Sequence, residues 1–253
     1  MLLDILFNSI VLPVLLYTIA RRLNNRLTSN PHVIFPMSVG WLSCYCSTQG
    51  WLSIPFEAKE LLAVIFALFS IITVLLSQAS TQRKNIAQML VASIGFFWIF
   101  ETPVKYDWTV YEHIQWFGLF VCSQFISFHY QVRSVLIEQL ILSCLCTSVA
   151  LGICGTLSFA QLSLGACLML ILILKEKIEP FELMPFIFLW AMGPYLGKHY
   201  GELTSSMLLA LILTPLGCGL IKHAPCRIAL SLSLYFCSLT LLWKGTPFQN
   251  LYF

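Results

Sequence analysis

Charged residues are scarce in this chain. Of its 253 residues, 10% are charged and 58% are hydrophobic, whereas soluble domains carry about 25% charged residues. The chain therefore lacks the polar surface that a water-exposed globule needs, which excludes an ordinary soluble domain. The formal charge of +3 is too small to predict binding to nucleic acid, so the first partner that we expect is the lipid bilayer.

Motifs of the common enzyme and cofactor classes are also missing. The sequence contains no G-x-S-x-G, no H-E-x-x-H and no Walker loop, so it predicts none of the hydrolytic chemistries that these motifs support. It lacks the several mid-helix histidines that haem ligation in a bundle needs. We therefore expect no cofactor. Whether the chain is an enzyme stays open, and the negative answer is favoured.

The cysteines do not form a metal-binding pattern. Cys44/Cys46 and Cys144/Cys146 are spaced C-x-C, which puts the two thiols of each pair on different faces of a helix. Neither pair has a histidine or a second cysteine pair at zinc-finger spacing. Most of the other cysteines fall inside apolar runs, where cysteine behaves as a small buried hydrophobe. We therefore expect no metal site.

Long apolar runs dominate what the chain does contain. They are near the length that crosses a hydrocarbon core of about 30 Å, and they are continuously apolar rather than alternating, which excludes a transmembrane barrel. Backbone groups in lipid must be hydrogen-bonded within their own segment, so these runs should be helices. Ten runs cover residues 3–20, 32–54, 61–79, 86–100, 114–130, 134–154, 157–174, 181–196, 204–221 and 228–243.

The predicted fold is therefore all-α, a polytopic integral membrane bundle in which residues 1–253 form a single transmembrane helical domain. Ten helices is the expected number. The runs at 86–100, 114–130 and 181–196 are the weakest, so eight or nine helices is the alternative.

The basic residues predict the orientation. With ten crossings and the N-terminus outside, five connections face the cytoplasm, and they hold ten of the fourteen basic residues. Cytoplasmic loops carry such an excess in membrane proteins. We therefore predict a multi-pass protein of the plasma (inner) membrane whose N-terminus and C-terminus are both extracytoplasmic. The ten residues are Arg21, Arg22, Arg26, Arg83, Lys84, Arg133, Lys175, Lys177, Lys222 and Arg227.

An internal duplication is a further interpretation of the ten runs. The tripeptide Pro-Phe-Glu occurs at 55–57 and 180–182, and Thr-Pro occurs at 102–103 and 214–215. Halves 1–133 and 134–253 would then be inverted repeats of five helices each, as in many transporters. The shared residues are few and unequally spaced, so chance similarity is favoured over duplication.

The most charged interruption lies at residues 101–113, on the predicted outer side. It contains Glu101, Asp107, Glu112 and His113, and a second outer loop contributes His199 and Glu202. Carboxylates and histidines of this kind can transfer protons or bind a cation. We expect these six residues to bind the substrate, because polar density on loops often marks function. The competing interpretation is that they are solvated loop ends, and it is favoured for any one of them alone and, by a smaller margin, for the cluster at Glu101, Asp107, Glu112 and His113.

Ionisable and helix-breaking residues inside the runs are few. Glu138 lies one turn into the run 134–154, and we expect it to form a structural ion pair with Arg133 across the connection that precedes the run. Five prolines should break or kink their helices, as the broken helices of transporter sites do, although proline is also commoner in membrane helices than in soluble ones. They are Pro13, Pro36, Pro185, Pro194 and Pro215.

The function predicted from these features is transport or binding of a small solute that enters from the extracytoplasmic face, with a carboxylate pairing to a cationic substrate or a coupling proton. One alternative is a non-catalytic subunit or assembly partner of a larger membrane complex, which would add other membrane subunits to the partners. A second alternative is an intramembrane enzyme acting on a lipid-linked substrate at the outer leaflet. The sequence does not specify the solute, the coupling ion or the oligomeric state.

Overall fold

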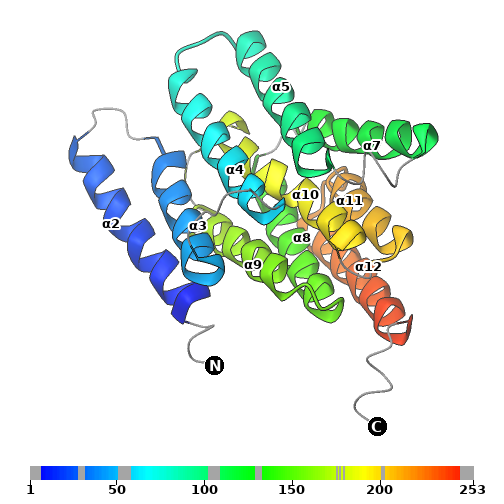
Figure 1. The fold of residues 1–253 in the computed structure, drawn as a ribbon. Coiled ribbons are helices and arrows are strands. Elements are labelled where there is room, and N and C mark those ends of the chain that lie inside the picture. The colour runs from blue at the N-terminus through cyan, green and yellow to red at the C-terminus, as the bar shows by residue number, and fades with distance from the viewer. Residues whose placement is uncertain are drawn as a thin grey trace. The chain divides into compact units, whose positions relative to one another are not determined.

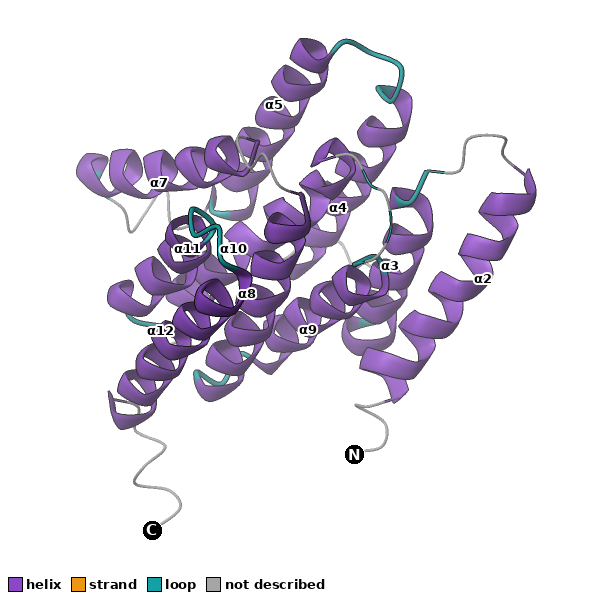
Figure 2. Ribbon diagram, turned by 180° about the vertical axis from the view of Figure 1, so that it is seen from behind, coloured by secondary structure: helices purple, strands orange, loops and turns teal. Residues whose placement is uncertain are grey.

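A computed structural model describes residues 7–27, 32–50, 58–101, 109–128, 133–174, 176, 178, 180–200 and 203–245. All regular secondary structure in these ranges is helical (Figures 1 and 2). The helices are η1 (Phe7–Val11), α2 (Leu12–Leu27), α3 (Ile34–Gln49), α4 (Ala58–Leu75), α5 (Thr81–Ile99), α7 (Val110–Phe128), α8 (Arg133–Ile153), α9 (Leu157–Leu172), η2 (Pro180–Leu183), α10 (Met184–Tyr200), α11 (Ser205–Cys218) and α12 (Ala224–Gly245).

The predicted all-helical class is confirmed. Within the described residues there are ten α-helices, and each overlaps one of the ten apolar runs. Continuous apolar runs form helices because a helix bonds its own backbone groups within one segment.

Among the described residues, three helices are both long and apolar enough to cross a membrane, judged by length and composition. Their spans are Ala58–Leu75, Val135–Ile153 and Ala224–Trp243. Leu157–Leu172 and Ser205–Cys218 are apolar but shorter. At about 1.5 Å per residue, a helix as short as α11 reaches only about two thirds of a hydrocarbon core of roughly 30 Å. These spans indicate a membrane protein.

The chain folds into two compact units. Unit 1 comprises Met1–Phe125 and Lys175–Leu189, and unit 2 comprises Ile126–Leu174 and Trp190–Phe253. The boundaries fall inside α7 and α10. They differ from the halves 1–133 and 134–253, because residues 175–189 belong to the first unit. The single-domain and repeat assignments stay predictions.

Unit 1 has an aromatic core. In this unit α3 packs against α2 and α4, and α4 packs against α5. The ring centroids of Trp41 and Phe66 are 4.2 Å apart, and Phe66 meets Phe186 edge to face at 5.3 Å. Phe69 and Phe188 extend the cluster with centroids 5.1 Å apart. Tilted and edge-to-face pairs of this kind add to the stabilisation from apolar burial.

Unit 2 is organised around α8, which packs against α9, α11 and α12. Two glycines bring the C-terminal part of α10 close to α8. A Cβ atom added at Gly193 would lie 2.9 Å from Thr147 Cγ2, and one at Gly197 would lie 2.5 Å from Leu151 Cδ2. Small residues four positions apart permit such close approach between membrane helices.

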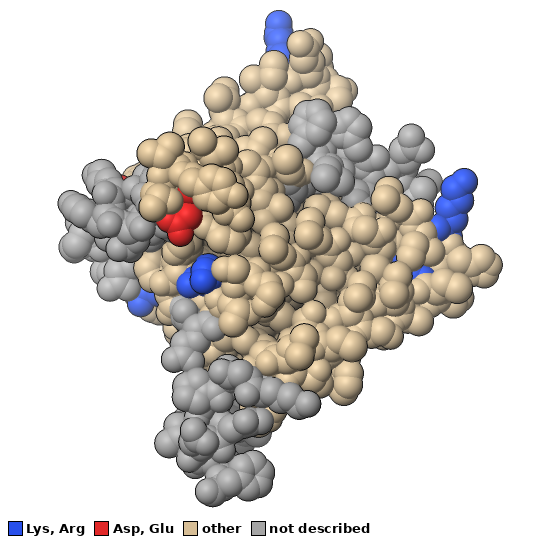
Figure 3. All heavy atoms as spheres, turned by 90° about the vertical axis from the view of Figure 1, so that its right-hand side faces the viewer, with Lys and Arg blue, Asp and Glu red and all other residues tan. Residues whose placement is uncertain are grey.

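Large apolar side chains cover much of the described surface. Charged side chains are few on the face in Figure 3, and most of the surface drawn there outside the grey residues is uncharged. On α12, Leu232, Phe236 and Trp243 are 51%, 70% and 48% exposed. An exposed apolar surface this extensive is unfavourable in water and indicates contact with lipid or with another protein.

Candidate functional site

Several side-chain hydrogen bonds of the described residues end on the carbonyl four residues before a proline. A proline has no N–H, so the carbonyl four residues earlier in a helix loses its donor. In a membrane that carbonyl must find another partner, because lipid supplies none. Pro215 lies inside α11, and the carbonyl it leaves free is that of Leu211. Ser143 Oγ of α8 donates a hydrogen bond to this carbonyl at 3.1 Å.

The same arrangement recurs at two further prolines, both in unit 1. Pro185 follows Phe181 by four residues, and Gln88 Nε2 of α5 donates to the Phe181 carbonyl at 3.0 Å. Pro13 follows Ser9 by four residues, and Cys44 Sγ of α3, a weak donor, lies 4.0 Å from the Ser9 carbonyl. In each case a buried side chain of another helix lies within hydrogen-bonding distance of the carbonyl four residues before a proline.

Two more prolines lie at helix starts and show the same spacing. Asn24 Nδ2 donates to the carbonyl of His32, four residues before Pro36, at 2.9 Å. Arg227 Nη1 donates to the carbonyl of Ile221, four residues before Pro225, at 2.8 Å. Five prolines in the described part of the chain thus follow, by four residues, a carbonyl with a side-chain donor.

A polar ladder runs along α8 in unit 2. It consists of Gln139, Ser143 and Thr147, which are one turn apart on one face and 1%, 0% and 1% exposed. The ladder extends about 12 Å along the helix axis. Ser143 is its middle rung, and it accepts a hydrogen bond from Trp190 Nε1 of α10 at 2.7 Å while donating to α11.

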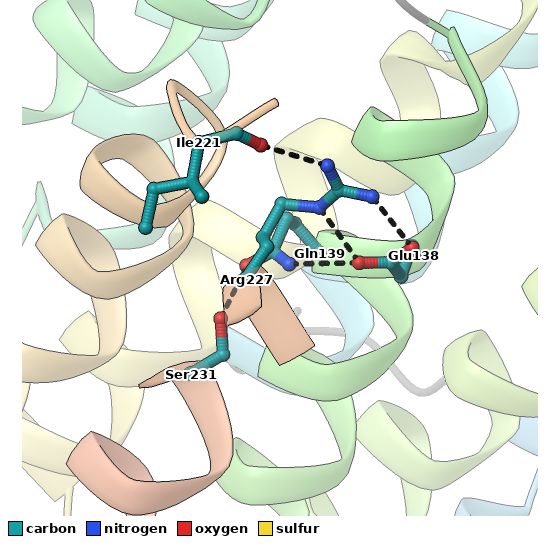
Figure 4. A network of polar contacts seen from close by, with 5 residues as sticks. All are labelled: Glu138, Gln139, Ile221, Arg227 and Ser231. Carbon is teal, nitrogen blue, oxygen red and sulfur yellow. Dashed lines mark hydrogen bonds and ion pairs between the residues drawn. The ribbon is translucent and has the colours of Figure 1, made fainter. Parts of the chain in front are cut away.

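An ion pair closes one end of the ladder (Figure 4). From α12, Arg227 Nε and Nη2 donate to Glu138 Oε1 and Oε2 of α8 at 2.9 and 3.0 Å. Beside them, Ser231 Oγ donates to Gln139 Oε1 at 2.9 Å. A two-point contact between a guanidinium and a carboxylate is among the stronger side-chain interactions. The network links α8 to α12, and the bond from Arg227 to the Ile221 carbonyl also links it to the turn before α12.

The predicted ion pair of Glu138 is only partly described. Glu138 does form an ion pair, and its partner in the structure is Arg227, 89 residues away. The side chain of Arg133 lies outside the described residues, so the contact between Arg133 and Glu138 stays a prediction.

The six predicted outer residues are distributed over both units. Glu101 lies just beyond α5 and is exposed, Glu112 is in the first turn of α7, and His199 is half-buried in the last turn of α10. Glu101 and Glu112 belong to unit 1, and His199 belongs to unit 2. Asp107, Glu202 and the side chain of His113 lie outside the described residues. The convergence of these residues on one substrate therefore stays a prediction.

Glu112 has a structural contact that the sequence interpretation missed. The N–H and Oγ1 of Thr109 donate to Glu112 Oε2 at 2.8 and 2.9 Å, and the Glu112 N–H donates back to Thr109 Oγ1 at 3.3 Å. This reciprocal pair is a capping box, and it satisfies donors at the N-terminus of α7 that have no partner within the helix.

We expect Glu112→Ala and Thr109→Ala each to lower the free energy of unfolding by about 1 kcal/mol, because each removes half of this cap. The matched control is Gln115→Ala on the exposed part of α7, which should change stability by less than about 0.5 kcal/mol. Thermal unfolding in lipid nanodiscs measures the difference. If Glu112→Ala unfolds at the wild-type temperature, the cap is not the role of Glu112.

Metal-ligating residues do not cluster in the part of the chain that the structure describes. No group of three or more His, Cys, Asp or Glu side chains converges there. The ten cysteines are free thiols, and Cys44 Sγ, a weak donor, lies 4.0 Å from the Ser9 carbonyl.

The sequence interpretation overlooked the ladder, although its spacing was visible. Gln139, Ser143 and Thr147 are spaced i, i+4 and i+8 within an apolar run, and Ser231 and Tyr235 repeat this spacing on α12. Residues four apart share a helix face, so a polar stripe could have been read directly. Comparison with family models, with curated proteins and with solved structures finds no match to this chain.

Proposed function

We propose that the chain is a multi-pass protein of the plasma (inner) membrane, crossing it ten times with both termini outside, that binds and moves a small solute entering from the extracytoplasmic face. The alternation of basic residues among the predicted connections supports the ten crossings. The three long apolar helices and the exposed apolar surface support the membrane location.

The observation that carries the proposal is the polar ladder of α8. Its three side chains are almost fully buried within a helix long enough to span a membrane. Polar groups buried in a membrane protein mark solute pathways in many transporters. The ladder also meets α10 and α11, two helices with internal prolines, and interrupted helices are the usual setting of transporter sites.

The proposed topology determines which end of the ladder lies nearer the outside of the membrane. Thr147 lies nearer the outer end of α8, and the pair of Glu138 and Arg227 lies at the inner end. In alternating access, a solute would enter past the outer end of α10, near His199, and reach the ladder. The ion pair of Glu138 and Arg227 would keep the inner end of the ladder closed. Release to the inside would then require Glu138 and Arg227 to separate.

Solute flux into proteoliposomes tests the proposal. The purified chain is reconstituted, and uptake of glycerol, urea and methylammonium is compared with uptake by protein-free vesicles of the same lipid. We expect at least one probe to enter the proteoliposomes faster. Equal rates for all three probes in both vesicle types would contradict transport of small solutes.

The subunit alternative is favoured by a different observation. Only 22% of the Ala224–Trp243 window of α12 is buried within the chain, which leaves an apolar face for a partner helix as well as for lipid. Isolation from membranes in mild detergent separates the two functions. A transporter should purify with copies of itself alone, whereas a subunit should purify in fixed ratio with a different membrane protein.

A further inference from the structure

An exposed apolar stripe runs along α2 and ends beside two arginines. The apolar side chains of the stripe are spaced four residues apart, and they are Val11, Leu15, Ile19 and Leu23. Arg22 and Arg26 are also exposed, and they lie on the same face, because residues three and four apart are neighbours on a helix. The opposite face is buried at Tyr17 and Ala20. The part of α2 that would contact acyl chains therefore leads directly to two guanidinium groups.

Helix α5 has the same pattern at its first turn. Its apolar stripe consists of the exposed residues Ile86, Leu90 and Ile94. Arg83 is exposed and lies three residues before Ile86, on the same face. The opposite face is buried at Gln88. Three exposed arginines thus lie at the ends of the two stripes, and they are Arg22, Arg26 and Arg83.

The C-terminal end of α2 and the N-terminal end of α5 lie at the same end of unit 1 (Figures 1 and 2). Arg21 of α2 forms an ion pair with Glu176, and Gln88 of α5 donates to the Phe181 carbonyl. The Lys84 ammonium of α5 lies 4.9 Å from the centroid of the Phe181 ring. Glu176 and Phe181 are five residues apart, a separation that spans at most about 18 Å. The arginines of both helices would therefore meet the same surface of a bilayer.

The carboxylates described at this end of unit 1 contact other groups. Glu176 pairs with Arg21, and Glu182 Oε1 lies 3.6 Å from His32 Nδ1. Within the described part of the chain, the three exposed arginines form no ion pair. This end of unit 1 therefore carries an excess of positive charge, and the group that neutralises it must be supplied by another molecule.

We propose that this end of unit 1 binds acidic phospholipids, with the three exposed arginines contacting the anionic head groups and the two apolar stripes contacting the acyl chains. A guanidinium can donate two N–H groups to one phosphate. An acidic segment of a soluble protein would supply the negative charge but no acyl chain for the stripes. A phospholipid supplies both, in the order in which the surface presents them. The proposal uses the membrane location of the chain and is independent of its orientation and of solute transport.

Photocrosslinking of the full chain in lipid nanodiscs tests the proposal. The bilayer is phosphatidylcholine with a small, equal fraction of either phosphatidylglycerol or phosphatidylcholine that carries a diazirine in its acyl chain, and mass spectrometry locates the adducts. On the stripes of α2 and α5 we expect about five times more adducts from phosphatidylglycerol, the factor for one arginine beside an anionic lipid. The two lipids should react equally at Leu232 and Phe236 of α12, because the nearby Arg227 is paired with Glu138.

Variants of the exposed arginines complete the test, and they should fold because surface substitutions change stability little. The triple variant Arg22→Gln/Arg26→Gln/Arg83→Gln should lower the ratio of the two lipids to about one on both stripes. Lysine at the same three positions keeps the charge and should keep a preference, and Lys222→Gln, a control at an exposed basic residue of unit 2, should leave the ratio unchanged. Equal adducts from both lipids in the wild type would overturn the proposal. A preference that survives in the glutamine variant would also overturn it, because the arginines would then not be its source.

Discussion

Replacing Arg227 with methionine is expected to lower the free energy of unfolding by about 2–3 kcal/mol, because it leaves the Glu138 carboxylate and the Ile221 carbonyl without their shared donor. Removing one partner of a buried ion pair typically costs about 3–5 kcal/mol. The lower value is expected here because the Glu138 side chain is 23% exposed and is partly screened by solvent.

Equilibrium unfolding in mixed detergent micelles, followed by tryptophan fluorescence, measures the effect. Lys222→Met is the matched control, because Lys222 is an exposed basic residue in the same turn and should change stability by less than about 0.5 kcal/mol. The double variant Glu138→Gln/Arg227→Met should lose less than the sum of the two single variants, since no charge is left unpaired. Additive losses would contradict a direct pair.

Replacing Ser143 with alanine is expected to destabilise the protein by about 2 kcal/mol, because its hydroxyl makes two hydrogen bonds. The Leu211 carbonyl loses its donor and the Trp190 indole loses its acceptor. Each such loss is worth about 1 kcal/mol between membrane helices. Ser238→Ala is the control, because its hydroxyl donates only to the Leu234 carbonyl of its own helix.

Substitution of Pro215 provides a second test of the predicted role of Ser143. Pro215→Ala restores the backbone N–H that the Leu211 carbonyl lacks, so in that background Ser143→Ala should cost about 1 kcal/mol less. If the cost is the same in both backgrounds, the hydroxyl is not compensating for the proline.

Sequence patterns predicted the helical class and the positions of the helices, but several helix ends lie elsewhere. The run 3–20 stops where the arginines begin, whereas α2 continues to Leu27. The helix can continue because Arg21 forms an ion pair with Glu176 and long basic side chains cover apolar surface while their charge stays outside. The start of α7 lies before the predicted run, because Thr109 and Glu112 cap it.

The candidate site was less predictable, because its contacts join residues far apart in the chain. Each proline was visible, and the carbonyl that it would free could be named from spacing alone. The donor could not be named. Ser143 is 68 residues from Leu211, and Gln88 is 93 residues from Phe181. The same separation explains why Arg227 was not assigned to Glu138.

The proposed entry of a solute depends on the membrane orientation of the chain, which would place residues 101–113 outside and residues 175–179 inside. Single cysteines at Asp107→Cys and Lys177→Cys, each in a full-length chain whose ten native cysteines are replaced, can be labelled with a membrane-impermeant maleimide. We expect position 107 to react in intact cells and position 177 to react only after permeabilisation. Labelling of position 177 but not position 107 in intact cells would contradict the orientation, and with it a solute that enters past the outer end of α10.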